Sequence, residues 1–272
     1  MGKELNMWIK TRNSIVVITF TLFLSSFLLI SCGNSTNVEI KKVDSSQQEI
    51  DIQFKNAEYL LDQDKSEEAY KILKKLADEG DAKSQIALGN GYEYGFWGNT
   101  NLEQAKYWYT KAANQNYAGG IHNLGVLEFK QGNYKQALPY FEKGESLNHP
   151  ESINILGVYY SEGIVFEQDY KKALEYFRQA VKYDDASAQF NIGQAYYYGD
   201  GVEKDYKEAF TWYIKSSNQG YSLATIQLAQ IYFHGLGLPK DKAKAIEIIK
   251  PLAELGDAKA IENLKLYTGS SN

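Results

Sequence analysis

The sequence is poor in cysteine, proline and histidine: its 272 residues include one, four and three of them. A single cysteine excludes a disulfide within the chain, so packing alone must hold the fold. With 44% hydrophobic and 23% charged residues, the composition is typical of an ordered domain. Residues 1–31 carry a net charge of +2, which leaves −7 for the remainder. The absence of a basic block there argues against a nucleic-acid partner.

Motifs for catalysis are also missing. There is no G-x-S-x-G, no Walker-type loop and no H-E-x-x-H. His122, His149 and His234 lie in different parts of the chain, each without a partner at helical metal-binding spacing. Only His122 occupies a position that we expect to face a binding surface. We therefore predict no catalytic residue, no metal site, no cofactor and no enzymatic activity.

The N-terminus has the pattern of an export signal. A basic start precedes residues 15–30, which contain no charge. As a helix this run spans roughly 24 Å, less than the ~30 Å of a membrane core. We interpret residues 1–31 as a cleavable signal peptide. The run ends in Leu-Ile-Ser-Cys at residues 29–32, which resembles the bacterial lipobox. The resemblance implies cleavage before Cys32 and a lipid on its thiol; a buried cysteine in an uncleaved anchor helix is the alternative.

The resemblance also implies a location. Acyl chains on Cys32 anchor a protein stably without a spanning helix. Gly33, not Asp, follows the cysteine, which in bacterial lipoproteins favours the outer membrane, facing the periplasm. In an organism with one membrane, the same anchor implies its exterior face. Residues 32–48 are polar and without periodicity, and are predicted to form a lipidated flexible tether.

An internal repeat dominates the rest of the chain. Small residues recur in two series at intervals of 32 or 36 residues, and we assign the first to helix A and the second to helix B of successive units. Small side chains let paired helices approach closely, which explains glycine inside a helix. The first series comprises Gly89, Gly125, Gly157, Gly193 and Ala229, and the second Ala69, Ala105, Ala137, Ala173, Ala209 and Ala245. Large apolar pairs such as Tyr107/Trp108 and Trp212/Tyr213 follow the second series.

A third column ends helix B. Eleven residues after each alanine of the second series stands a residue that tolerates the left-handed conformation. The two series are 16 residues apart in long units and 12 in short ones, and the spacing from Ala57 to Ala69 reveals a first, short unit. The six residues of the third column are Gly80, Asn116, Asn148, Asp184, Gly220 and Gly256.

The long unit, seen in residues 191–217, resembles the Sel-one-like repeat, and the short unit at 124–147 resembles the related tetratricopeptide repeat. The resemblance covers residues 49–266. It implies an all-α, right-handed superhelical solenoid of about six antiparallel helix pairs, followed by a capping helix at 258–267. We place the repeat domain at 49–268 and a disordered tail at 269–272.

The concave side of such a solenoid is lined by helix A. Positions three before, one after and four after the small residue form one stripe on that helix. The stripe has exposed aromatics and few charges, which is typical of an interface; the alternative is that Phe190, Ile226 and Phe233 pack on adjacent helices. The predicted groove residues are Asn90, Glu93, His122, Val126, Phe129, Asn154, Val158, Phe190, Gln194, Tyr197, Ile226, Gln230 and Phe233.

We therefore expect a monomeric, non-catalytic adaptor that holds a protein or peptide in this groove while its lipid contacts the membrane. Resemblance to lipid-anchored repeat proteins offers a sharper alternative, an immunity protein that blocks a toxic effector such as a lipase. Two further alternatives are a cell-wall or antibiotic hydrolase and a structural spacer.

Overall fold

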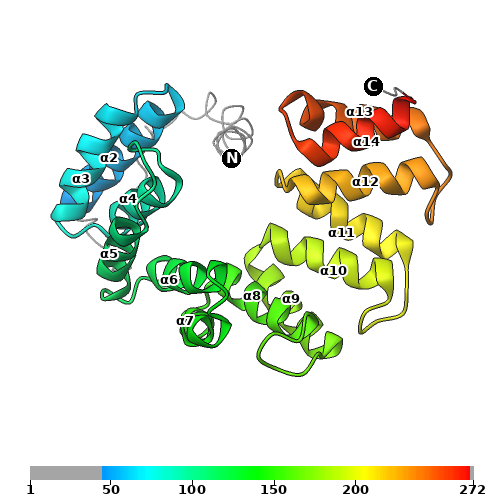
Figure 1. The fold of residues 1–272 in the computed structure, drawn as a ribbon, viewed down its shortest axis with the longest axis horizontal. Helices are drawn as coiled ribbons and strands as arrows, with labels where there is room; N and C mark the ends of the chain where they lie inside the picture. Colours follow the sequence, from blue (N-terminus) through cyan, green and yellow to red (C-terminus); the bar gives the residue numbers. More distant parts are fainter. Residues whose placement is uncertain (1–44, 270–272) are drawn as a thin grey trace, which may run out of the picture.

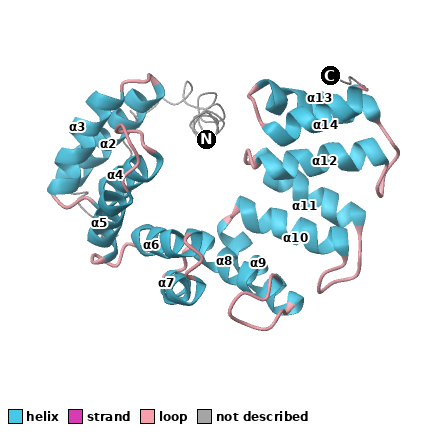
Figure 2. Ribbon diagram, viewed as in Figure 1, coloured by secondary structure: helices cyan, strands magenta, loops and turns pink. Residues whose placement is uncertain are grey.

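The computed structural model describes residues 45–269, and this part of the chain contains helices and loops but no strand (Figure 2). The predicted all-α fold is confirmed. The α-helices are α2 (Ser45–Asp62), α3 (Ser66–Asp78), α4 (Ala82–Tyr94), α5 (Leu102–Ala113), α6 (Ala118–Lys130), α7 (Tyr134–Ser146), α8 (Pro150–Ser161), α9 (Tyr170–Ala180), α10 (Ala186–Tyr198), α11 (Tyr206–Asn218), α12 (Ser222–His234), α13 (Lys242–Glu254) and α14 (Ala258–Thr268). A 3-10 turn, Val181–Tyr183, follows α9.

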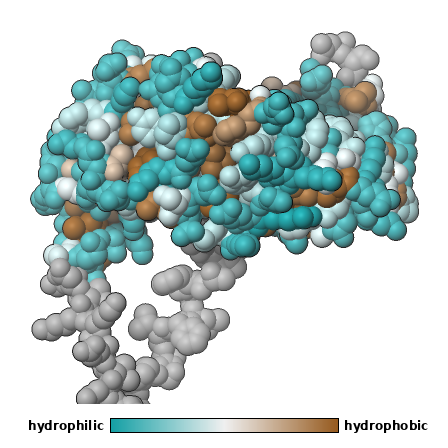
Figure 3. All heavy atoms as spheres, turned by 90° about the horizontal axis from the view of Figure 1, so that it is seen from below, coloured by the Kyte–Doolittle hydropathy of each residue, from teal (hydrophilic) through white to brown (hydrophobic). Residues whose placement is uncertain are grey.

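The helices pack in six consecutive pairs, from α2/α3 to α12/α13, and α14 packs on α13. The chain follows a C-shaped path, with α2–α5 in one arm, α6–α9 at the base and α10–α14 in the other arm (Figure 1). Successive A helices also meet at three places, where α4 meets α6, α8 meets α10 and α12 meets α14. At the base, α6 lies on the inner side of the C and α7 on the outer side (Figure 1). Seen from below, the surface is largely hydrophilic and its apolar residues form separate patches (Figure 3).

Glycine in helix A seats an aromatic ring of helix B. A Cβ on Gly193 would lie 2.6 Å from the ring of Tyr213, and a Cβ on Gly157 would lie 2.4 Å from the ring of Phe177. Gly89 and Gly125 face Tyr109 and Phe141 in the same way. In the last pair both partners differ. Ala229 occupies the glycine position, and the buried Ile249 occupies the position of the aromatic ring. The predicted close approach of the two helices is therefore confirmed.

The predicted stop column is confirmed at every position. All six residues have positive φ angles, from 56° at Asn116 to 104° at Gly80. Asp184 closes the 3-10 turn after α9 with φ 61°. Aspartate caps start several of the helices: the Asp185 carboxylate accepts from the Ala188 N–H at 2.6 Å at the start of α10, and Asp205 accepts from the N–H groups of Lys207 and Glu208 at the start of α11.

Two details of the prediction differ from the structure. In the second pair, Trp108 and Tyr109 are buried whereas Tyr107 is 48% exposed, so the buried aromatic pair lies one residue later than predicted. Helix α2 begins at Ser45, inside the range 32–48 predicted as a tether. The predicted signal peptide, Cys32 and residues 270–272 lie outside the described residues. Within residues 45–269, no helix is both long and apolar enough to cross a membrane.

Candidate protein-binding groove

The apolar residues of the predicted stripe are largely covered by neighbouring helices. Phe190 and Ile226 are only 8% and 4% exposed. The Phe190 ring lies 5.2 Å from that of Tyr221, and the Phe233 ring stacks on Tyr267 at 4.2 Å. The expectation of an exposed aromatic is therefore wrong at Phe190, whereas Phe233 keeps part of its surface exposed beneath Tyr267.

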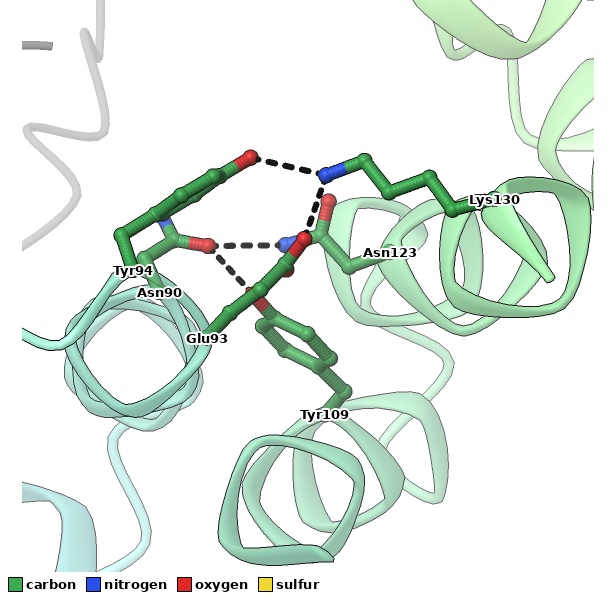
Figure 4. A network of polar contacts seen from close by, with 6 residues as sticks. All are labelled: Asn90, Glu93, Tyr94, Tyr109, Asn123 and Lys130. Carbon is green, nitrogen blue, oxygen red and sulfur yellow. Dashed lines mark hydrogen bonds and ion pairs between the residues drawn. The ribbon is translucent and has the colours of Figure 1, made fainter. Parts of the chain in front are cut away.

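Near the N-terminus the stripe is occupied by a polar network (Figure 4). The Tyr109 hydroxyl lies 2.7 Å from Asn90 Oδ1 and 2.8 Å from Glu93 Oε2, both of which accept hydrogen bonds. The Lys130 ammonium forms an ion pair with Glu93 and a hydrogen bond with Tyr94. Burial alone lowers the pKa of Lys130, but its bonds to Glu93 and Tyr94 raise it above its ordinary value. Asn90 and Glu93 thus join α4, α5 and α6.

The middle of the stripe is also engaged within the protein. His122 Nδ1 and His149 Nδ1 lie 3.0 Å and 3.2 Å from the Ser152 hydroxyl, and the two imidazole rings are 4.8 Å apart. Spacing along the sequence gave no sign of this pair, because His149 lies in the turn before α8. Asn154 is buried and its side-chain oxygen accepts from Asn191.

The other members of the middle stripe pack against their neighbours. Phe129 lies among the rings of Tyr134, Phe141 and Tyr159, while Val126 and Val158 are partly buried against core clusters. Tyr197 packs among other tyrosine rings of its own unit.

An open groove remains in the C-terminal arm. It has a volume of about 730 Å³ and crosses α10, α12 and α14. Four predicted residues line it, and the prediction missed the other six. We call it the C-terminal groove. Its lining comprises the predicted Phe190, Gln194, Ile226 and Gln230, together with Leu223, Gln227, Lys259, Glu262, Asn263 and Leu266.

The missed residues of α14 follow the repeat. Lys259, Glu262 and Leu266 stand 36 residues after Leu223, Ile226 and Gln230, so α14 provides a further helix A to the groove. Because α14 was expected only to cap the solenoid, its contribution to the groove was not predicted. Extending the 36-residue interval by one unit would have found these residues.

Glutamine amides cross the floor of the groove between apolar side chains. Gln194 Oε1 accepts from the Tyr213 hydroxyl at 2.8 Å, which orients that amide. Gln227 Oε1 is buried and has no donor among the described residues. An unpaired buried acceptor costs about 1–3 kcal/mol, and a donor from outside reaches Gln227 Oε1 only if this side chain turns toward the groove. Lys259 and Glu262 provide one charge of each sign.

The described residues contain no group of three or more His, Cys, Asp or Glu side chains placed to hold a metal ion. The groove presents amides, apolar surface and one charge of each sign, a set of side chains suited to binding.

The fold and this groove define a helical-repeat solenoid, a class whose stacked units create extended concave binding surfaces. A family model, Sel1 repeat, matches residues 82–117, 150–182, 186–221 and 222–257, just over half of the chain. The chain belongs to the Sel1 repeat family. The predicted resemblance is confirmed at the level of the repeat.

Solved structures share the architecture. A Sel1 repeat protein from Oxalobacter formigenes is 26% identical, with a TM-score of 0.64 over 78% of this chain and 88% of that one. An immunity protein from Pseudomonas aeruginosa, Pa5087, is 20% identical, with a TM-score of 0.61 over 78% of this chain and 83% of that one; at this identity the likeness concerns the fold. A Sel1-like repeat-containing protein of Acanthamoeba polyphaga mimivirus is 35% identical over 77 residues, which span 28% of this chain and only 14% of that protein.

Proposed function

We propose that this chain is a non-catalytic, lipid-anchored adaptor that binds a segment of another protein in the C-terminal groove. The open groove of about 730 Å³ across α10, α12 and α14 carries this proposal, because it brings apolar side chains and amides together on one concave surface. Apolar contacts with Leu223 and the exposed Leu266 provide the hydrophobic part of binding, over a floor that includes the buried Phe190 and Ile226. The fold family supports protein binding as the general function.

A bound segment with both apolar and polar positions suits this surface best. The glutamines lie on two neighbouring helices, so their amides can pair with successive backbone groups. Leu266 is 63% exposed at the edge of the groove and offers an apolar contact to side chains of the partner. Since the rim carries one lysine and one glutamate, a strongly charged segment gains little from it.

A photo-crosslinking residue at position 266 is expected to give a discrete protein adduct in cells, which mass spectrometry identifies. Gln230→Arg is expected to weaken binding of the purified partner by at least about tenfold, since it places a long charged side chain in the groove. Titration of the partner by calorimetry measures this change.

Two controls match this experiment. Gln104→Arg makes the same substitution on the exposed face of α5 and is expected to leave the affinity unchanged. A crosslinker at position 102, where Leu102 is 50% exposed, tests whether adducts depend on the groove. Equal adducts from positions 102 and 266, or equal affinity of both arginine variants, would contradict the groove as the binding site.

We further propose that lipid on Cys32 holds the domain at the bacterial outer membrane, facing the periplasm, or at the exterior face of the membrane in a single-membrane organism. The basic start, the uncharged run and the Leu-Ile-Ser-Cys sequence support this proposal. A tethered binding domain meets partners near the membrane at a raised effective concentration.

Cys32→Ala is expected to move the protein from the membrane fraction to the soluble fraction and to abolish labelling by a fatty-acid probe. Because the thiol is the only attachment point for lipid, no other residue compensates. Fractionation and immunoblotting measure the outcome, and Ser31→Ala, which keeps both a small residue and the thiol, is the control. Membrane association of Cys32→Ala equal to that of the wild type would exclude lipidation as the anchor.

A second candidate is an immunity protein that neutralises an effector delivered to the periplasm. Support comes from the fold shared with the Pseudomonas aeruginosa immunity protein and from the net charge of −7 after residue 31, which suits a basic effector. Protection of growth against an effector encoded beside this chain distinguishes this candidate from an adaptor.

A further inference from the structure

The second helix pair departs from the repeat at its connecting loop. Phe96 and Trp97 stand where the last two long units have the turns Gly199-Asp200-Gly201 and Gly235-Leu236-Gly237. The Trp97 indole enters the side of α4 at Gly91, where an added Cβ would lie only 1.7 Å from Nε1. Its N–H donates to the Leu88 carbonyl at 3.2 Å. The Gly91 column holds large or apolar residues in the other units, namely Leu127, Tyr159, Ala195 and Ile231.

The rings of Phe96 and Trp97, together with two tyrosine rings, form the walls of a pocket. We call this pocket, lined by Tyr70, Tyr92, Phe96 and Trp97 with Ser66 and Glu67 at its rim, the aromatic box; its volume is about 460 Å³. The planes of Tyr70 and Tyr92 meet at 89°, and those of Phe96 and Trp97 at 79°. Trp97 and Tyr70 are 5.4 Å apart and inclined by 56°. The rings therefore present faces in several directions around one space.

A role in packing alone does not account for this arrangement. If Trp97 only filled the volume left by Gly91, neighbouring side chains would cover it, yet all four rings keep part of their surface exposed. The volume of the box also falls within the range of about 300–1,000 Å³ typical of ligand sites.

The ring faces of the box are not used by lysines of the protein. Elsewhere, lysine ammonium groups lie over aromatic rings: Lys74 is 5.3 Å from the Trp108 ring, and Lys215 is 4.0 Å from the Trp212 ring. Over residues 45–269, the lysine–ring contacts use other rings than these four, and no basic residue lines the pocket. The box thus offers cation-binding faces without a cation of its own.

We propose that the aromatic box binds an alkylated ammonium group, such as the trimethylammonium of choline. Aromatic rings attract cations through their negative faces, most strongly where water is excluded, and several rings around one space suit a quaternary ammonium. The Glu67 carboxylate adds a compensating charge. Glu67 pairs with Lys71 at 2.9 Å, but both side chains are highly exposed, so this pair contributes little and does not prevent binding.

The site lies on α3, α4 and their connections, in the opposite arm from the C-terminal groove. It does not depend on the function proposed for that groove, and each can fail without the other.

Titration of the full-length protein with choline is expected to give saturable binding, measured by calorimetry and by tryptophan fluorescence. The matched probe is 3,3-dimethylbutan-1-ol, which has the shape of choline but no charge. It is expected to bind at least about tenfold more weakly, because cation–π attraction requires the charge. Equal binding of the two compounds, or no binding of choline, would overturn the proposal.

Two substitutions locate the site. Glu67→Gln is expected to weaken choline binding several-fold, whereas Glu68→Gln, the adjacent acid on α3 outside the box, keeps the wild-type affinity. Tyr70→Leu removes one wall and is expected to cost about tenfold in affinity; if it does not fold, Glu67→Gln still decides the result. Equal affinities of Glu67→Gln and Glu68→Gln would assign binding elsewhere.

Glycerophosphocholine distinguishes the source of the ammonium group. Binding as tight as that of choline indicates a phospholipid head group, and binding of choline alone indicates a free solute. Both outcomes support the ammonium site.

Discussion

Gly193→Ala is expected to lower the free energy of unfolding by about 2 kcal/mol, and Tyr213→Ile by about 3 kcal/mol, yet the double variant should lose only about 3 kcal/mol. The added Cβ would meet the Tyr213 ring at 2.6 Å, and this ring is fully buried. Overpacking costs about 1–3 kcal/mol, which exceeds the helix-propensity gain of about 1 kcal/mol in replacing glycine. Isoleucine removes the ring and restores space for the methyl group, as Ala229 and Ile249 do in the last pair.

Denaturant unfolding followed by circular dichroism measures all four proteins, and the coupling between the two sites is expected to be about 2 kcal/mol. Gly119→Ala in α6 is the matched control. There a Cβ would lie 2.9 Å from the terminal methyl of Ile86, which can move aside. Additive losses at residues 193 and 213, or an equal loss at Gly119, would show that the close approach of helix A and helix B does not require glycine.

This column of small residues explains why the fold could be predicted well. Each unit repeats the same contacts between helix A and helix B, so several copies of one pattern fix the register together. A single copy can still mislead. Tyr107 and Trp108 match an apolar pair as readily as Trp108 and Tyr109 do, but one residue rotates a helix by about 100° and leaves Tyr107 half exposed.

The candidate site was harder to predict, because it depends on how successive units are rotated against each other. The spacing within a helix places Phe190 and Phe233 on the stripe, but it does not reveal that Tyr221 and Tyr267 cover them. The same limit applies to the Gly91–Trp97 contact. There the side chain of Trp97, which lies in a loop, fills the space that a helical side chain fills in other units. The repeat pattern shows that this unit differs, but it does not show where the Trp97 side chain lies.

The pair of histidines at the base of the solenoid makes its stability depend on pH. Burial, together with the nearby His149, lowers the pKa of His122 to about 3. In the unfolded chain the pKa of histidine is about 6.5. Between these values the unfolded chain binds more protons than the folded one, so the stability contributed by neutral His122 is complete above pH 6.5 and is lost as the pH falls. The slope is about 1.4 kcal/mol per pH unit.

The His122→Gln variant lacks this loss. We therefore expect the difference in free energy of unfolding between the wild type and His122→Gln to shrink by about 2 kcal/mol when the pH is lowered from 6.5 to 5. Glutamine can still bond to Ser152 but takes up no proton. Burial raises the pKa of Asp185 to about 6, which favours folding as the pH falls, but both proteins carry this residue, so its effect is the same in both. Denaturant unfolding at several pH values measures the difference. His234→Gln replaces an exposed histidine and should follow the wild-type curve. Parallel curves for His122→Gln and the wild type would mean that protonation of His122 does not destabilise the junction of α6 and α8.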